Sequence, residues 1–387
     1  MSVTSAAGFV ASGIPAGIKG GGALDLSLVA TDDGRAVPVA GVFTSNLMTA
    51  APVTVSRSHL RSSAGAGAAV ILNAGNANAA TGERGCEDAE TMCGLTAAEL
   101  GCDRHHVLVC STGLIGIPLP IDVIAAAIPT LVGARRIDGA KDAAEAIRTT
   151  DTHAKQVTVR SDGFTVGGMA KGAAMLAPNM ATMLAVLTTD ARADAATLAA
   201  ALEEGVAESF NSLSIDGCTS TNDTVLLLAS GRAGPVGRPR LAAAVAAACD
   251  DLASQMAGDA EGATKVVRLI VTGAHTDDEA RVAARKVAES QLVKCSWYGK
   301  DPYWGRIASE LGSAGVAFDP RLVSISYGGV TVCRAGIEVD HDRDAVEAHM
   351  ATRTLTIECD LGLGAGRGTV LTNDLTHAYI DENMGTS

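Results

Sequence analysis

The chain has 387 residues, a formal net charge of −13 at pH 7 and a hydrophobic fraction of 47 %, with aromatic residues at only 3 %. This length predicts two tightly associated domains and allows a large core to form without disulfides or metals. The acidic balance argues against a nucleic-acid partner, because phosphate binding needs clustered Lys and Arg and the sequence has no such run.

Strand and helix patterns alternate along the chain, which predicts an α/β fold. In the first half, short apolar runs that end in Gly, Ser or Asn predict strands at 37–46, 68–78 and 105–113. Helical patterns occur at 120–133, 141–148, 191–209, 239–257 and 277–288. A strand is expected next at 290–299, and the last third is expected to be mostly strands, at 322–333, 355–364 and 369–380.

The cysteines and histidines carry no metal or disulfide signature. The nine cysteines are an odd number without a C-x-x-C pair, which predicts reduced thiols in the cytoplasm. His105 and His106 are adjacent in a predicted strand and should point to opposite faces, so no metal is expected. The first residues lack a positive region before their apolar stretch, and no apolar run approaches the length of a membrane span. Neither a signal peptide nor a membrane partner is therefore expected.

Near the middle of the chain, the segment KGAAMLAPNMATML (171–184) contains an Ala181–Thr182 step. An unactivated hydroxyl is a weak nucleophile at neutral pH. If the chain were cleaved before Thr182, the new α-amine would lie beside the hydroxyl and could act as its general base. The reference pKa of an α-amine, about 7.7–8.0, suits this role near neutral pH. The dipeptide alone is common in ordinary strands and helices, so the argument depends on the surrounding block.

This block resembles the self-cleavage site of the ornithine acetyltransferase family, whose pattern is roughly KGxGM-x-x-P-x-x-ATML. Further blocks resemble the same family and follow in order along nearly the whole chain. They are AGVFTSN (40–46) with AAPV (50–53), ILNAGNANAATG (71–82), CSTGLIG (110–116), RTTDT (148–152), GGMAKG (167–172), DGCTSTNDT (216–224), DAEGATK (259–265), DPYWGRI (301–307) and AYIDENMGTS (378–387).

The resemblance implies that the precursor breaks itself between Ala181 and Thr182. Residues 1–181 would form an alpha chain and residues 182–387 a beta chain that begins with the nucleophile. The last third of the beta chain would include a smaller C-terminal domain. The implied fold is α/β, an αββα-type sandwich like that of N-terminal nucleophile enzymes with a smaller second α/β domain. Processed alpha/beta heterodimers would associate with one another, as α2β2.

The same resemblance assigns the catalytic residues. Thr182 is the nucleophile in both self-cleavage and transfer, while the Thr112 hydroxyl and the Gly113 backbone N–H would stabilise the tetrahedral oxyanion. The block CSTGLIG fits this role physically, because an apolar strand ends in a small hydroxyl residue and a Gly that lets backbone approach a ligand closely.

The resemblance also assigns the substrate-binding residues. Lys171 would supply the local cation that carboxylate substrates need in an acidic protein. Glu261 could hold the cationic amine of ornithine. The full substrate-binding set is Thr149, Lys171, Thr182, Glu261, Asn383 and Ser387.

The implied activity moves acetyl from N2-acetyl-L-ornithine to L-glutamate in arginine biosynthesis, in ping-pong order through an acetyl-Thr182 ester. No cofactor is required. The sequence leaves open whether acetyl-CoA is a second donor and whether the true substrate belongs to secondary metabolism. Two alternatives also stay open: a self-processing amidohydrolase or aminopeptidase that uses water as acceptor, and an uncleaved homologue that only binds.

Three positions depart from the family pattern. Ala174 replaces the Gly of KGxGM, Tyr303 replaces the Asn of DPNWGR, and the C-terminus after Asn383 is one residue short and lacks the usual Tyr. The first two departures could alter local loops, and the third affects the substrate-facing tail.

Two further segments resemble ligand-binding loops. GLGAGRG (362–368) resembles a phosphate loop, but strand-like residues follow where a helix is needed, so a tight hairpin is expected. TSTNDT (219–224) carries hydroxyls and Asp223 that could bind phosphate or magnesium, but a buried polar turn supporting the site is the preferred interpretation.

Overall fold

A computed structural model describes residues 2–177 and 183–385. It divides into two compact units. The first comprises Met1–Asn211 and Thr219–Met256, and the second comprises Ser212–Cys218 and Ala257–Gly385. Ala181, Thr182 and Ser387, three residues of the predicted site, lie outside the described residues.

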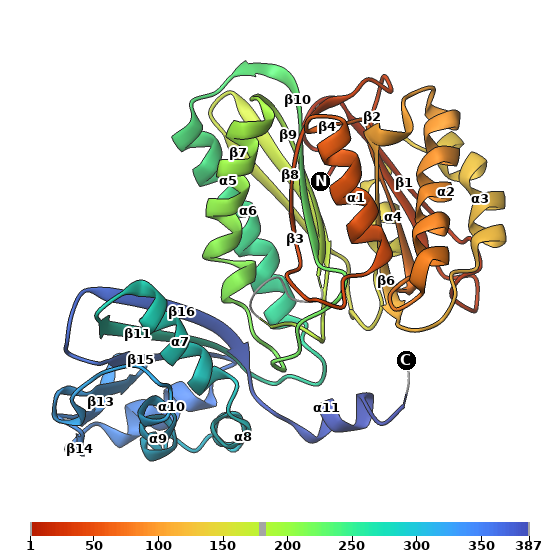
Figure 1. Cartoon of the computed structure of the whole chain (residues 1–387). Coiled ribbons are helices and arrows are strands. Elements are labelled where there is room, and N and C mark those ends of the chain that lie inside the picture. The colour runs from red at the N-terminus through yellow and green to blue at the C-terminus, as the bar shows by residue number, and fades with distance from the viewer. Residues whose placement is uncertain (1, 178–182, 386–387) are drawn as a thin grey trace. The chain divides into compact units, whose positions relative to one another are not determined.

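The first sheet of unit 1 has four strands in the order β1-β2-β5-β6. Only β5 and β6 run parallel to each other. Three helices cover the outer face of this sheet, and their apolar side chains pack with those of β2, β5 and β6 (Figure 1). The elements are β1 (Phe9–Ile14), β2 (Leu26–Thr31), β5 (Ala69–Asn76), β6 (Val107–Leu114), α1 (Ala51–Ser62), α2 (Gly82–Leu100) and α3 (Ile121–Gly133).

The second sheet of unit 1 has six strands in the order β4-β3-β10-β9-β8-β7. Strands β9 and β10 are parallel and all other pairs are antiparallel. Two helices cover the outer face (Figure 1), and α5 packs against β3 and β10. The elements are β3 (Val37–Phe43), β4 (Ala66–Gly67), β7 (Lys155–Ser161), β8 (Phe164–Lys171), β9 (Leu184–Arg192), β10 (Thr224–Pro235), α5 (Ala195–Ala207) and α6 (Arg238–Gly258).

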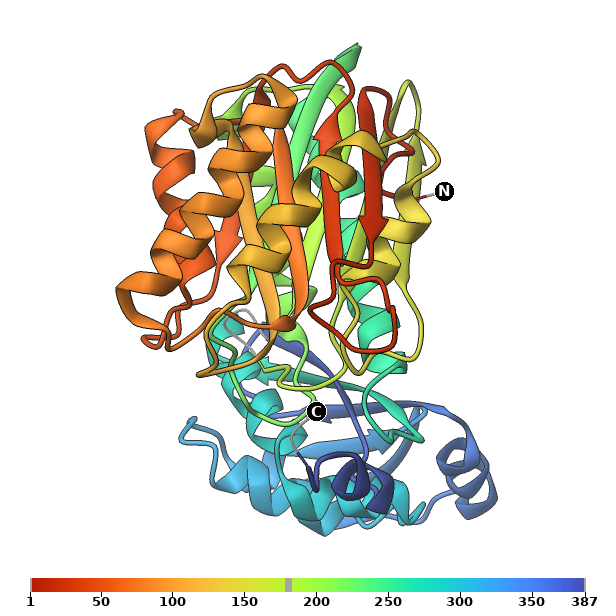
Figure 2. The same ribbon diagram turned by 90° about the vertical axis from the view of Figure 1, so that its right-hand side faces the viewer.

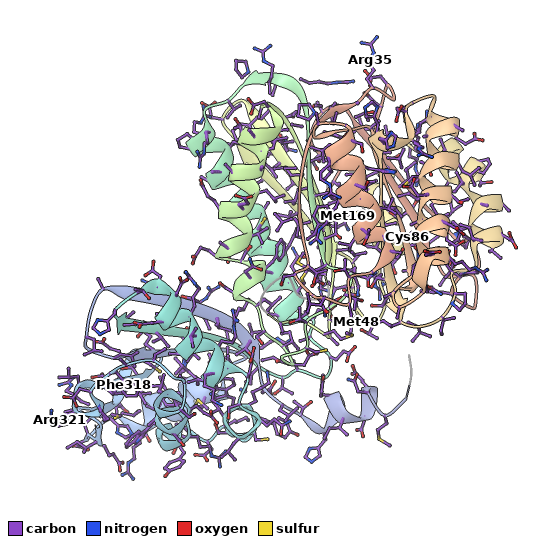
Figure 3. The ribbon with its side chains drawn as sticks, viewed as in Figure 1. Arg35, Met48, Cys86, Met169, Phe318 and Arg321 are labelled. Carbon is purple, nitrogen blue, oxygen red and sulfur yellow. The ribbon has the colours of Figure 1, made fainter. Side chains whose placement is uncertain are left out.

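The two sheets pack face to face around one apolar core. Val70 and Leu108 contribute from the first sheet, and Met169, Val186 and Leu226 from the second. Met169 is labelled on β8 in Figure 3. Helix α4 (Ala140–Ala146) packs against β1 and β2 and adds small residues to this core. Figure 1 shows the layers of unit 1 side by side in the order helix, sheet, sheet, helix, and Figure 2 looks onto the helices that cover the first sheet. The αββα sandwich implied by the resemblance is therefore confirmed.

Unit 2 is smaller and has a single six-stranded sheet in the order β14-β13-β12-β15-β11-β16. Its core includes Trp297 and Tyr327, and Phe318, labelled in Figure 3, packs against it. The strands are β11 (Val266–Ala274), β12 (Ser324–Tyr327), β13 (Val330–Arg334), β14 (Ile337–Glu338), β15 (Thr354–Asp360) and β16 (Gly366–Asn373). The helices are α7 (Asp277–Ala288), α8 (Gln291–Tyr298), α9 (Trp304–Gly312), α10 (Arg343–Ala351) and α11 (His377–Glu382).

The five helices expected from the sequence are present as α3 to α7, and the three strands expected in the first half are present as β3, β5 and β6. Local capping explains several boundaries. The Asp194 carboxylate accepts the Thr197 N–H before α5, and Thr276 accepts the Glu279 N–H before α7. A side chain at this position satisfies a backbone donor that the first turn leaves without a partner.

The strand predicted at 290–299 is wrong, because these residues form helix α8. Ser290 caps the helix by accepting the Val293 N–H. Val293 and Trp297, four residues apart, bury the same helical face. A short run of apolar and β-branched residues fits both periodicities, so the sequence pattern was ambiguous here.

The strand predicted at 369–380 is correct only in its first part. Strand β16 ends at Asn373, and Thr376 caps α11 by accepting the Tyr379 N–H. Helix α10, in the same third of the chain, lies between the strands predicted at 322–333 and 355–364. The predicted strand at 105–113 begins late: His105 and His106 lie in a 3₁₀ turn, Arg104–His106, before β6.

The tight hairpin predicted for 362–368 is also wrong. Strands β15 and β16 are not neighbours, because β11 lies between them. The glycine-rich loop crosses the end of β11, where the Leu363 N–H donates to the Gly273 carbonyl at 2.7 Å. A sequence pattern identifies a turn between two strands but not which strands pair, so the two topologies look alike.

Candidate active site

The end of β6 has the backbone shape expected for a close approach to a ligand. Thr112 is buried, and Gly113 has a φ of +131°, a conformation that favours glycine. Gly113 pairs with Gly75 of β5, whose φ is +102°. A Cβ on Gly113 would overlap the Gly75 backbone. The register shifts here, with Asn76 opposite both Thr112 and Leu114, as in a β-bulge that redirects the chain.

The segment 219–224 forms a buried polar turn that ties several loops together. The Asn222 amide Nδ2 donates to the carbonyls of Ala77, at 2.6 Å, and Ser111, at 2.9 Å. The Ser111 hydroxyl in turn donates to Asn73 Oδ1 at 2.6 Å. The turn therefore supports the strand end that carries Thr112, as the preferred interpretation of this segment expected.

Asp223, in the same turn, holds the residue that directly follows Thr182. Its Oδ1 accepts the Met183 N–H at 2.9 Å, and the Thr224 N–H donates to the Met183 carbonyl at 3.1 Å. Burial raises the pKa of the Asp223 carboxyl well above its usual range, against the opposing effect of hydrogen bonds and of Lys171. The position of Met183 is thus fixed on both sides of its backbone.

Lys171 is the last residue of β8 and pairs with Leu184, the first residue of β9. Its side chain is buried, and its positive charge favours the ionised forms of both Asp151 and Asp223. The strand pairing therefore places this cation beside the chain segment that starts after Thr182.

Asp151 is a buried carboxylate that joins the predicted substrate residues of unit 1. Its Oδ1 accepts from Lys155 Nζ at 2.6 Å and from the Gly172 N–H at 2.7 Å, while Oδ2 accepts the Thr149 N–H at 3.1 Å. Burial alone would raise the pKa of this carboxyl. Lys171, Lys155 and the Gly172 N–H outweigh that effect and lower it well below its usual range.

In unit 2, Glu261 and Asn383 lie in contact. Asn383 Nδ2 donates to Glu261 Oε2 at 2.7 Å and to the Tyr379 carbonyl at 2.9 Å. Glu261 is buried and Asn383 is exposed. In unit 1, Thr149 and Lys171 are linked through Asp151, and Thr112 and Gly113 lie at the end of β6. In unit 2, Glu261 and Asn383 are in direct contact.

The two internal departures from the family pattern are exposed or half-buried. Ala174 lies in the bend after β8. Tyr303 precedes α9 without capping it, and its ring lies against Gly305. Tyr303 also lines a cavity of about 240 Å³ in unit 2 together with Asp301 and Trp304.

Two polar residues with a structural role in this site were given no role by the sequence reasoning: Lys19 and Asp151. Asp151 belongs to a block that resembles the family, RTTDT, and an acidic residue inside such a block was an available signal. Lys19 carried no comparable signal. Residues 2–177 and 183–385 contain no group of three or more His, Cys, Asp or Glu that could hold a metal ion.

Unit 1 is an αββα sandwich. It holds a Thr–Gly strand end and two buried lysines around the Asp151 carboxylate, an arrangement typical of an α/β enzyme. The chain belongs to the ArgJ family, whose model matches residues 10–385. No helix in the described parts of the chain has the length and apolar character needed to cross a membrane.

Two curated relatives are similar to this chain over its full length. The arginine biosynthesis bifunctional protein ArgJ of Streptomyces avermitilis is 46 % identical over 388 residues, spanning 100 % of both chains. The protein of the same name from Mycolicibacterium paratuberculosis is 48 % identical over 394 residues, covering 100 % of this chain and 96 % of the relative. Among solved structures, ornithine acetyltransferase of Mycobacterium tuberculosis in complex with ornithine is 45 % identical, covering 46 % of this chain and 94 % of that one, with a TM-score of 0.43.

The buried carboxylate of Asp151 generates a stability prediction. Asp151→Asn should destabilise unit 1 by about 3–5 kcal/mol, because it leaves two buried lysines without their shared counter-charge. Urea unfolding followed by far-ultraviolet circular dichroism would measure this. Fluorescence is unsuitable because both tryptophans, Trp297 and Trp304, lie in unit 2. Asp138→Asn, which removes an exposed partner of Arg136, is the control and should change little.

The low pKa of Asp151 also predicts how the free energy of unfolding depends on pH. The folded-state pKa of Asp151 lies below the unfolded value of about 3.9, so its stabilisation is complete above about pH 5 and is lost as the pH falls through the folded-state pKa. The difference between wild type and Asp151→Asn should be constant from about pH 6 to 8 and shrink below about pH 4. An equal difference at all these pH values would show that Asp151 does not act through its charge.

Proposed function

We propose that the chain cleaves itself between Ala181 and Thr182 and then transfers acetyl from N2-acetyl-L-ornithine to L-glutamate in arginine biosynthesis. One contact network supports this proposal above all. Asn222 supports the strand end that carries Thr112, and the adjacent Asp223 holds Met183, the residue bonded to Thr182. Adjacent residues of one turn thus hold Met183 and the strand end that carries Thr112.

Cleavage proceeds by an N-to-O acyl shift. Thr182 Oγ attacks the Ala181 carbonyl carbon, the peptide C–N bond breaks, and the proton of the hydroxyl passes to the new α-amine. Water then hydrolyses the ester, which leaves a carboxylate on Ala181 and a free hydroxyl on Thr182. The products are residues 1–181 and residues 182–387.

Transfer uses the same hydroxyl, with the α-amine of Thr182 as general base. Oγ attacks the acetyl carbonyl, and ornithine leaves with a proton on its α-amine. The α-amine of glutamate then attacks the acetyl ester, and Oγ regains its proton as N-acetylglutamate leaves. Thr112 and Gly113 stabilise the oxyanion of both tetrahedral intermediates.

The remaining residues bind the two substrates. Lys171 and Thr149, joined through Asp151, contact the substrate in unit 1. Glu261, paired with Asn383, binds the cationic amine of ornithine, and Ser387 closes the pocket. The full-length relatives, which are named for arginine biosynthesis, support this choice of substrates.

Assembly and location follow from the same family resemblance. Processed alpha and beta chains associate as α2β2 in the cytoplasm. Five cysteines buried as thiols fit a reducing compartment: Cys93, Cys110, Cys249, Cys333 and Cys359.

The maturation prediction concerns the Ala181–Thr182 bond. Denaturing electrophoresis and intact mass should show fragments of 181 and 206 residues (387 − 181 = 206). Thr182→Ala should stay at full length because it lacks the hydroxyl that attacks, while Thr182→Ser should still cleave. An active preparation that contains only the full-length chain would refute this proposal.

The oxyanion prediction concerns Thr112. Thr112→Ala should lower kcat on the order of 10²–10³-fold, with a smaller change in KM, because the hydroxyl binds charge that develops in the transition state. Thr112→Ser, which keeps the hydroxyl, is the control and should retain most activity. A change in KM alone would reassign Thr112 to ground-state binding.

An assay with each donor offered separately tests the function itself. Acetylornithine with glutamate should yield N-acetylglutamate, and double-reciprocal plots should be parallel, as ping-pong order requires. Acetyl-CoA is the second donor to offer, since the relatives are named bifunctional. Release of acetate that does not depend on glutamate would instead identify a hydrolase.

A further inference from the structure

Lys19 lies in a loop that is held rigidly by one buried carboxylate. Asp25 accepts the backbone N–H groups of Ala16, Gly17, Ile18 and Lys19, at 2.6, 3.1, 2.6 and 2.8 Å respectively. Asp25 is itself fully buried. The backbone position of Lys19 is therefore fixed by the fold.

The stem of Lys19 passes directly beside the strand end that carries the proposed oxyanion donors. A Cβ added to Gly75 would lie 2.9 Å from Lys19 Cγ. Gly75 in turn pairs with Gly113, and the two backbones are in close contact. One glycine thus separates Lys19 from Gly113.

The ammonium of Lys19 has a single hydrogen-bond acceptor within the described residues. Nζ donates to the Arg148 carbonyl, next to Thr149, at 3.1 Å. The Arg148 guanidinium is occupied by Glu145 and by the Asp151 carbonyl. Burial lowers the pKa of Lys19, and the negative charge of Asp25 opposes this shift. No carboxylate among residues 2–177 and 183–385 lies at ion-pair distance from Nζ. A half-buried cation with two unused donors suits an anionic ligand.

Both substrates carry such an anion close to the reacting acyl group. In acetylornithine the acetylated nitrogen and the α-carboxylate are bonded to the same carbon. Standard bond lengths therefore keep the carboxylate within about 5 Å of the acyl carbon that is attacked. Glutamate attacks through its own α-amine, so its α-carboxylate must occupy the same region in the second half-reaction.

We propose that Lys19 binds the α-carboxylate of both substrates and so orients the acyl group against Thr112 and Gly113. This proposal rests on the proposed function and adds a second cation to Lys171. Lys171 is near two carboxylates, those of Asp151 and Asp223, whereas a backbone carbonyl is the one acceptor of the Lys19 ammonium in the described part of the chain.

Lys19→Gln tests the role of the charge, because the side chain keeps a polar donor while the cation is lost. We expect it to mature and unfold like wild type, with KM for acetylornithine and for glutamate raised on the order of 10–100-fold, as for a lost charged hydrogen bond. The change in kcat should be smaller. Lys19→Arg should restore KM to near the wild-type value. Lys141→Gln, at an exposed position in the same unit, is the matched control.

A donor without the α-carboxylate, N-acetyl-1,4-diaminobutane, provides the decisive comparison. Wild type should use it with a raised KM, and Lys19→Gln should raise that KM no further, because the interacting group is already absent. A wild-type KM for this donor equal to that for acetylornithine would overturn the proposal without any variant. So would a Lys19→Gln variant in which only kcat falls, or in which KM rises equally for both donors. If wild type transfers no acetyl to glutamate, the proposed function fails and not this inference alone.

Discussion

The pairing of β9 with its two neighbours is the constraint on which the site depends. Strand β9 lies between β8 and β10 and is buried along all but its last residue. It begins at Leu184, two residues after Thr182, and the parallel register with β10 sets Leu184 opposite Thr224. From Leu184 on, the segment that follows Thr182 is therefore fixed by backbone hydrogen bonds in the middle of a sheet. Cleavage before Thr182 removes none of these bonds, so the sandwich does not depend on the bond that is proposed to break.

An acidic protein that handles carboxylate substrates must concentrate cations locally, and unit 1 does so through buried carboxylates. Asp151 compensates Lys155 and Lys171, and Asp25 fixes the loop that carries Lys19. A buried ion pair contributes little net stability, but removing one partner is costly. Such an arrangement holds charged groups in place near a reacting centre, where electrostatic interactions are stronger than in water.

Much of the fold could be predicted from sequence because it depends on local periodicity. Helix α7 begins and ends where its pattern does, and the apolar run before Thr112 forms β6. Prediction failed where the signal was short or where it depended on distant partners. Helix α8 spans only eight residues with a mixed pattern, and the loop before β16 crosses a strand that is some ninety residues earlier in the chain. The contacts of the site also join residues that are far apart in the sequence. Lys19 meets Arg148 across 129 residues, and Asn222 meets Ser111 across 111, separations that no local pattern reveals.

The central claim is that acetyl passes through a covalent ester on Thr182. Incubating the purified protein with acetylornithine alone, quenching with acid and measuring the intact mass of both fragments tests it most directly. The account predicts one added acetyl group on the 182–387 fragment, none on the 1–181 fragment, and its loss when glutamate is added. Full transferase activity with no acetylated fragment at any time, together with intersecting double-reciprocal lines, would mean direct transfer in a ternary complex and would contradict the account.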